Sequence, residues 1–166
     1  LIRKGMGAGE DYIEGPFHAL NDVVMARGSV SRVLTIKTDV DGADLASLRA
    51  DGMILATATG STGYNLAVGG PILDPLSESL VLKPIAAHVG LSASLVLDPS
   101  VQVALHLEGA QDAVLSVDGF EDLPMKPGDW VKVEQSPLKT KFLRLMPHSH
   151  FYATLTRRLG FSVRGR

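Results

Sequence analysis

The sequence contains no cysteine among its 166 residues, which excludes disulfides, thiolate zinc sites and cysteine nucleophiles and fits a reducing compartment. It also lacks an excess of positive charge, since 16 Lys+Arg stand against 18 Asp+Glu. A surface that binds duplex needs such an excess, so nucleic acid is not expected as a partner. No apolar run reaches the roughly 18 residues that span a bilayer, and residues 1–17 do not form a signal peptide. We therefore expect a soluble, cytoplasmic protein that does not act at a membrane.

The length and the hydrophobic content of 45% suit one domain with a core of its own, so residues 1–166 are expected to fold together. The chain begins at Leu1, and no methionine precedes Met6. This suggests a fragment, a processed product or a missing upstream segment.

Turn signals such as Asp41-Gly42, Asp51-Gly52 and Asp118-Gly119 separate short runs that alternate or are β-branched. Alternation predicts strands with one buried side. The expected strands are 19–27, 31–39, 43–49, 53–57, 80–86, 93–98, 101–108, 113–117, 130–135 and 139–146.

Two stretches are expected to be helical. Residues 61–68 are closed by Gly69-Gly70-Pro71, and Phe151, Leu155 and Leu159 recur at helical spacing before Gly160. The sequence therefore predicts an all-β protein: a distorted two-sheet β-sandwich with a short helix after a Gly/Ser/Thr loop and a helix at the C-terminus.

The most informative stretch is residues 50–71, in which an apolar strand leads into Thr-Gly-Ser-Thr-Gly and a short helix. Glycines let a backbone approach a ligand closely, and hydroxyls and a helix N-terminus offer hydrogen bonds. The stretch is neither a Walker loop nor a Gly-x-Gly-x-x-Gly fingerprint. From composition alone it is either a tight structural connection or a ligand-binding loop.

Asn21 and Asp22 interrupt the apolar run from Ala19 to Met25, and two polar residues in a buried strand need partners. Either a ligand supplies them, or the pair lies at a strand start or bulge and satisfies its own backbone. In an unbroken strand the two side chains would face opposite sides. A shared site therefore predicts that the regular ladder is broken at this pair.

Of the five histidines, only His148 and His150 are close together, and the adjacent Pro147 and Ser149 favour a solvated loop over a metal site. No serine–histidine–acid arrangement can be argued from the order of residues. No metal site is predicted.

Five segments resemble, in order, the C-terminal domain of NAD kinases (ATP/polyphosphate–NAD kinases). They are residues 19–28, 51–72, 83–88, 118–119 and 155–161. The resemblance implies a two-sheet β domain that binds NAD and an upstream α/β domain whose Gly-Gly-Asp-Gly aspartate works near the transferred phosphoryl group. That motif is absent here, because Gly-Gly occurs only at 69–70 and precedes Pro71. We expect no catalytic residue in this chain and no activity of the chain alone.

Carried over position by position, the resemblance assigns Asn21 and Asp22 to an Asn-Glu pair that contacts NAD. It assigns Thr62 through Ala67 to the segment that cradles the dinucleotide. The residues that it implies at the NAD site are Asn21, Asp22, Arg32, Arg49, Asp51, Thr62, Gly63, Tyr64, Asn65, Leu66 and Ala67.

The implied reaction is transfer of the terminal phosphoryl group of ATP, or of polyphosphate, to the adenosine ribose 2′-hydroxyl of NAD, giving NADP. It needs positioning, a divalent metal (Mg) with ATP, and a base. The family also suggests homodimers or homotetramers with sites shared between subunits. One alternative is a standalone dinucleotide-binding or oligomerisation module without catalysis. The other is part of a related lipid kinase, but the Gly-Ser-Thr loop favours NAD as the ligand.

Overall fold

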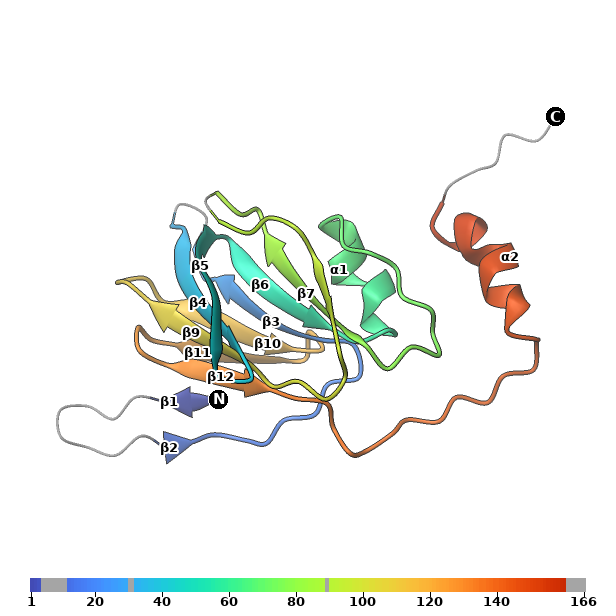
Figure 1. Cartoon of the computed structure of the whole chain (residues 1–166), viewed down its shortest axis with the longest axis horizontal. Coiled ribbons are helices and arrows are strands. Elements are labelled where there is room, and N and C mark those ends of the chain that lie inside the picture. Colours follow the sequence, from blue (N-terminus) through green and yellow to red (C-terminus); the bar gives the residue numbers. More distant parts are fainter. Residues whose placement is uncertain (4–11, 30–31, 89, 161–166) are drawn as a thin grey trace.

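The computed structural model describes residues 1–3, 12–29, 32–88 and 90–160, and these form two six-stranded antiparallel sheets (Figure 1). The all-β, two-sheet prediction is confirmed. The first sheet has the order β2-β1-β12-β9-β4-β5, and the second has the order β11-β10-β3-β6-β7-β8. The strands of the first sheet are β2 (Tyr12–Ile13), β1 (Ile2–Arg3), β12 (Trp130–Val133), β9 (Val103–Glu108), β4 (Leu34–Val40) and β5 (Ala43–Ala50). Those of the second are β11 (Glu121–Met125), β10 (Ala113–Val117), β3 (Asp22–Arg27), β6 (Gly52–Ala56), β7 (Leu80–Ile85) and β8 (Leu95–Leu97).

The main core lies between the two sheets, where period-2 alternation brings apolar side chains of both sheets together. In β4, for example, Leu34 and Ile36 are fully buried while Thr35 and Lys37 are only partly covered. Strand β6 is buried along its whole length. Its second face joins a smaller cluster in which Ile54 and Ala56 pack near Val68 and Leu73, from the segment that follows α1. The chain after β6 thus covers part of the outer face of the second sheet.

The helices expected after the glycine-rich loop and near the C-terminus are both present. The first is divided into a 3₁₀ turn (Gly60–Thr62) and the short helix α1 (Tyr64–Ala67). The second is α2 (Ser149–Arg158), which lies apart from both sheets (Figure 1). Within the described ranges, no helix is both long enough and apolar enough to cross a membrane.

Two strand predictions need correction. The strand expected over 19–27 begins only at Asp22. Residues 139–146, which alternate in sequence, form no strand, because no neighbouring strand pairs with them among the described residues. Strands β1, β2 and β11 were not predicted. The first two have only two residues each, too few for a periodic signal, and β11 contains Pro124 at a sheet edge.

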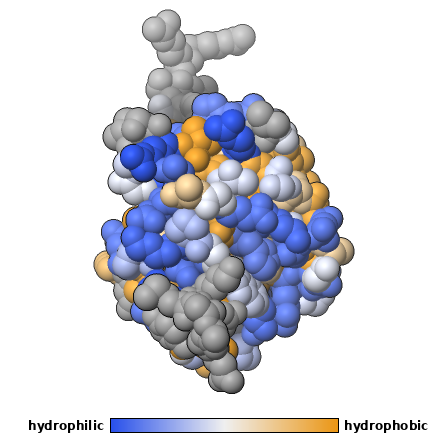
Figure 2. Space-filling model, turned by 90° about the vertical axis from the view of Figure 1, so that its left-hand side faces the viewer, coloured by the Kyte–Doolittle hydropathy of each residue, from blue (hydrophilic) through white to orange (hydrophobic). Residues whose placement is uncertain are grey.

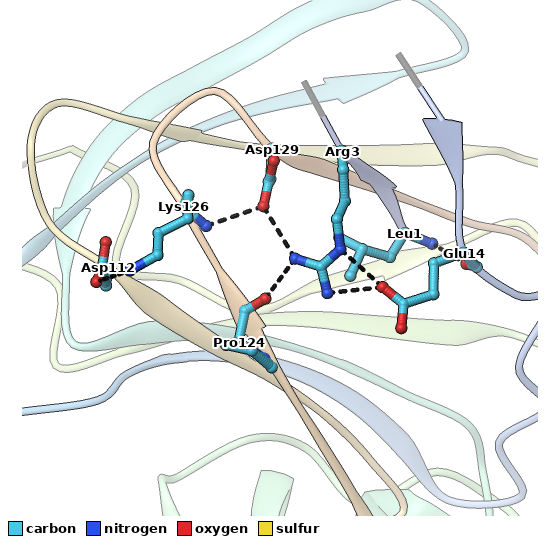
Figure 3. Close-up of polar contacts among 7 residues, drawn as sticks. All are labelled: Leu1, Arg3, Glu14, Asp112, Pro124, Lys126 and Asp129. Atoms are coloured by element: carbon cyan, nitrogen blue, oxygen red, sulfur yellow. Dashed lines mark hydrogen bonds and ion pairs between the residues drawn. The ribbon is translucent and has the colours of Figure 1, made fainter. Parts of the chain in front are cut away.

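The short strands β1 and β2 are held by a polar network around Arg3 (Figure 3). The Arg3 guanidinium contacts the Glu14 carboxylate at 2.6 Å, donates to the Pro124 carbonyl, and reaches Asp129 at 3.4 Å. The buried Asp129 carboxylate also accepts the Lys126 backbone N–H. Arg3 thereby joins the first hairpin to the turn between β11 and β12.

Candidate functional site

A cavity of about 510 Å³ lies on the outer face of the second sheet, beside the 3₁₀ turn and α1. Its floor comes from alternate residues of two paired strands: Asp22, Val24 and Ala26 of β3, and Val114 and Ser116 of β10. The described residues that line it are Asn21, Asp22, Val24, Ala26, Thr59, Thr62, Gly63, Tyr64, Val114, Ser116, Asp118, Gly119 and Asp122. An apolar floor with polar groups around it suits a flat ring that carries hydroxyl-bearing substituents.

The backbone at the rim of this cavity is held by Asp118. The Asp118 carboxylate accepts the backbone N–H groups of Leu20, Asn21 and Asp22 at 2.7, 2.7 and 3.0 Å. Asp118 has a φ of 52°, a left-handed conformation that aspartate tolerates better than most residues. Three converging N–H groups form a concavity that favours an anion, and this carboxylate fills it. Residues 20–22 are therefore fixed by a side chain about a hundred positions away in the sequence.

The opposite side of residues 20–22 is closed by the loop after β6. Thr57 donates its backbone N–H to the Asn21 carbonyl at 2.8 Å and its hydroxyl to the Leu20 carbonyl at 2.7 Å. Gly60 packs so closely that an added Cβ would lie 2.1 Å from the Asn21 carbonyl oxygen. A glycine at position 60 lets the two backbones approach closely. Residues 20–22 and the loop after β6 therefore form one structural unit.

This arrangement brings Asn21 and Asp22 to the same opening. Because β3 begins at Asp22, Asn21 lies outside the regular ladder, and both residues line the cavity. The predicted break in the strand is therefore confirmed. Asn21 uses only its backbone groups in the described contacts, so its amide is available to a ligand.

The electrostatics of the cavity are acidic. Three carboxylates line it, from Asp22, Asp118 and Asp122, and none of the described lining residues is Lys, Arg or His. Partial burial raises the pKa of the Asp22 carboxyl above its ordinary value, and the negative charge of Asp118 raises that pKa further. Such a lining favours neutral or cationic groups and hydroxyl donors over phosphates.

The glycine-rich loop contributes both cavity-lining and structural residues. Thr62, Gly63 and Tyr64 line the cavity, and the Tyr64 side chain is 45% exposed, so it is not part of the core. Asn65 is fully buried and donates its amide to the carbonyls of Ser61 and Pro71. These two hydrogen bonds stabilise the conformation of the loop. Leu66 and Ala67 continue α1 and are not among the lining residues.

The remaining predicted site residues lie elsewhere in this chain. Asp51 follows β5 and pairs with Arg27 at 2.9 Å, at the end of β3 opposite Asp22. Five residue steps along a strand place that end roughly 17 Å from Asp22. Arg49 is exposed on β5 of the other sheet, and Arg32 donates to Gln111.

The face of the molecule on the left in Figure 1, toward which β3 runs, is largely hydrophilic (Figure 2).

Neither the cavity nor the histidines provide a metal site in the described part of the chain, where no group of three or more His, Asp or Glu side chains could hold an ion. His148 contacts the Asp74 carboxylate at 3.1 Å, and the Tyr152 hydroxyl donates to the same carboxylate. The Tyr152 hydroxyl, the Leu76 N–H and His148 lower the pKa of Asp74. These contacts attach α2 to the loop that follows α1.

Sequence reasoning missed Asp118 and Asp122 as residues of this site. The turn that the sequence predicts at Asp118-Gly119 is confirmed, since both residues have positive φ. The signal in the sequence that could have identified Asp118 is the resemblance itself, in which residues 118–119 form one of the five matching segments. Asp122 is exposed on an edge strand, and no local pattern distinguishes it.

Comparison with known proteins places these features in a family context. Residues 20–145 match the model of the ATP-NAD kinase C-terminal domain. The chain is 46% identical to an NAD kinase of Chloroflexus aggregans over 145 residues, which are 87% of this chain and 52% of that protein. It is 42% identical to an NAD kinase of Dehalococcoides mccartyi over 143 residues, 86% of this chain and 50% of that one. The chain thus spans about half the length of the curated relatives it matches.

Two solved structures share the fold. Yeast NADH kinase complexed with NADH superposes with a TM-score of 0.77 at 26% identity, covering 90% of this chain and 46% of that one. An NAD kinase from Archaeoglobus fulgidus in complex with ATP superposes with a TM-score of 0.74 at 25% identity, and the match covers 87% of this chain and 55% of that one.

Proposed function

Because the chain belongs to the ATP-NAD kinase family, we propose that it provides the NAD-binding part of an NAD kinase. In the proposed reaction the terminal phosphoryl group of ATP, or of polyphosphate, passes to the 2′-hydroxyl of the adenosine ribose, giving NADP. The observation that carries the proposal is that Asn21, Asp22, Thr62 and Tyr64 all line the same cavity. No observation favours a standalone binding module or a lipid kinase.

The cavity suits the adenosine half of a dinucleotide. Val24, Ala26 and Val114 offer an apolar surface to a ring, and Tyr64 can lie against a ring face. The Asp22 carboxylate and the Asn21 amide can hydrogen-bond ribose hydroxyls or ring nitrogens. These groups would hold the acceptor hydroxyl in place, and positioning of this kind is a large part of phosphoryl-transfer catalysis.

The family implies that ATP acts with a divalent metal such as Mg. The described residues do not fit a protein-held metal, since their carboxylates form no group of three that could hold an ion. We therefore assign the metal to the incoming ATP. The base that accepts the hydroxyl proton is also assigned outside this chain.

We further infer that the native assembly is a homodimer or homotetramer. The resemblance assigns Arg49 and Asp51 to the dinucleotide site, but both lie away from the cavity of their own chain, so a neighbouring copy would bring them to a bound dinucleotide. A molar mass of twice or four times 17.6 kDa in light scattering would support this inference, and a monomer at every concentration would contradict it. A cytoplasmic location stays a prediction.

The central test is binding of NAD to the purified chain by calorimetry, with Asn21→Ala as the variant. The loss of one buried hydrogen-bond partner should weaken binding by about 1–3 kcal/mol. The melting temperature should not change, because the Asn21 side chain has no described contact within the chain. Gln102→Ala is the control, since its side-chain amide contacts Glu134 at an exposed position outside the cavity. Equal NAD affinity in both variants would contradict the proposed site.

A further inference from the structure

Asp122 is a cavity-lining carboxylate that neither the sequence patterns nor the resemblance selects. It lies on β11, where its register partner is Ser116 of β10, and Ser116 is in turn the register partner of Val24 on β3. Directly paired residues of an antiparallel sheet have their side chains on the same face, so these three side chains form one row across the cavity floor. The three strands lie side by side (Figure 1). Asp122 therefore ends this row on the side of β11.

Asp22 and Asp118 occupy the next row of the same face. The Asp118 backbone N–H donates to the Asp22 carbonyl at 3.0 Å, and both residues line the cavity. Neighbouring strands lie about 4.8 Å apart and two residues along a strand span about 6.6 Å, so the three carboxylates lie within roughly 12 Å of one another. A group bound above Ser116 would therefore feel all three, because the Debye length is about 10 Å at 0.1 M salt.

The described lining of the cavity offers little to offset these negative charges. It contains no Lys, Arg or His. The three backbone N–H groups of residues 20–22, which converge as an anion site would require, already donate to the Asp118 carboxylate. Burial raises the pKa of the Asp22 carboxyl, and the charge of Asp118 raises it further, so charges in this cavity act on one another.

The proposed reaction changes the charge of the molecule that occupies the cavity. The acceptor brings a neutral 2′-hydroxyl, which can donate a hydrogen bond to a carboxylate. In the transfer the 2′-oxygen loses its proton and gains a bond to phosphorus, while the donor loses its terminal phosphoryl group. The product then carries a phosphate monoester with a charge of about −1.5 to −2 at pH 7. Carboxylates accept hydrogen bonds but have none to donate to such a group, and its charge repels theirs.

We propose that Asp122, together with Asp22 and Asp118, makes the cavity select the unphosphorylated dinucleotide over its 2′-phosphorylated product. Asp122 is the specificity-determining residue of the three, because Asp22 is placed to contact the ribose and Asp118 holds the backbone of residues 20–22. Weak binding of the product frees the cavity for the next acceptor molecule and limits inhibition by NADP. This inference rests on the proposed function, since it requires the adenosine half of NAD in the cavity.

The test compares the affinities of the purified chain for NAD and NADP by calorimetry. We expect NADP to bind about tenfold or more weakly than NAD at about 0.1 M salt. The difference should shrink at about 1 M salt, where the Debye length falls to about 3 Å. Binding of NAD together with equal or tighter binding of NADP would overturn this inference and leave the proposed function standing. Absence of NAD binding would contradict the proposed function and this inference with it.

Asp122→Asn keeps the size of the side chain and removes one charge. The ratio of the NADP and NAD dissociation constants should fall by about threefold, through tighter binding of NADP, which a merely destabilised variant would not show. Glu108→Gln is the matched control, because it removes one charge from an exposed strand residue that does not line the cavity, and its ratio should equal that of the wild type. An unchanged ratio in Asp122→Asn, or an equal fall in Glu108→Gln, would overturn the role assigned to Asp122.

Discussion

At the residue scale, Asp22 carries a cost to stability at the candidate site. Its carboxyl is partly buried beside Asp118, and both burial and the neighbouring charge raise its pKa. The described contacts include no hydrogen bond to the Asp22 side chain that would offset this effect. The charged form therefore destabilises the folded chain, and it is retained at the position where a ligand can use it.

A pH-dependent prediction follows for Asp22→Asn. Because the folded-state pKa is raised, the protonated wild type has its full stability below the ordinary aspartate value of 3.8 and loses stability as the pH rises through the higher folded-state value. At pH 7 the variant should therefore melt at a higher temperature than the wild type. Below pH 3.8 the difference should disappear.

Thermal melts at pH 7 and pH 3.5, followed by circular dichroism, check this prediction. Asp122→Asn is the control, because that carboxylate is exposed at the cavity edge and its neutralisation should change melting little at either pH. A lower melting temperature for Asp22→Asn at pH 7 would mean that the folded chain stabilises the carboxylate, contrary to the argument.

Tyr64 supports a second prediction at this scale. Its ring is 45% exposed and lines the cavity, so Tyr64→Ala should reduce NAD affinity by about 1–2 kcal/mol, the size of an aromatic contact, with little effect on melting. Calorimetry measures the affinity, and Tyr64→Phe, which keeps the ring, should bind nearly as well as the wild type. A large drop in melting temperature with unchanged affinity would instead assign Tyr64 a structural role.

At the scale of elements, the candidate site consists of two backbone segments that hydrogen-bond to each other. Residues 20–22 lie between the Asp118 carboxylate and the loop Thr57–Thr62, with backbone hydrogen bonds on both sides. Neither segment is a regular strand or a long helix at the point of contact. The rigidity that a site needs therefore comes from the sheet that carries both segments, through the pairing of β3 with β6 and β10.

Gly60→Ala tests the contact between these two segments. The added Cβ would lie 2.1 Å from the Asn21 carbonyl oxygen and 2.8 Å from its Cα, and backbone atoms cannot yield without breaking the contact with Thr57. We expect destabilisation of about 1–3 kcal/mol, the usual cost of overpacking, together with loss of NAD binding. Chemical denaturation measures the first and calorimetry the second.

Gly28→Ala is the matched control for this variant. Among the described residues, its added Cβ would meet the Val114 side chain at 3.6 Å, an ordinary contact. Its free energy of unfolding should stay within about 0.5 kcal/mol of the wild type. If Gly60→Ala proved equally harmless, the loop and residues 20–22 would not form one unit.

At the scale of the whole molecule, the chain carries a binding surface without the remaining groups of a phosphoryl-transfer site. Within the described residues, the cavity presents carboxylates and hydroxyls but no cation to neutralise a phosphate. Catalysis of phosphoryl transfer relies on cations around the transferred group. Under the proposed function, the donor half of the reaction is therefore assigned to a part of the full-length protein that this sequence does not span.

The isolated chain should accordingly form no NADP from NAD, ATP and Mg²⁺ at any concentration. A coupled assay with an NADP-specific dehydrogenase provides the measurement, and the full-length Chloroflexus aggregans NAD kinase is the positive control. Turnover above background would show that a carboxylate of this chain, Asp22 or Asp51, serves as the base.

Local patterns in the sequence determined most of the strands and both helices. In β4, β9 and β10 alternate residues are buried, so the period of hydrophobicity reports the strand directly. The turns at Asp41-Gly42 and Asp118-Gly119 have the positive φ values that these residue types indicate. Resemblance in sequence also identified Asn21, Asp22 and Thr62–Tyr64, all of which line one cavity.

Only the tertiary structure decided the features that depend on distant partners. Residues 139–146 have the alternation of a strand but form none, because a strand needs a neighbour and none pairs with them in the described part of the chain. Asn65 lies in the predicted site segment but is turned inward, since the carbonyls of Ser61 and Pro71 take its amide. Asp118 became a site residue only when folding brought it to the backbone of residues 20–22. Sequence periodicity records which face of an element is apolar, whereas the contacts of a polar side chain depend on which elements pack together.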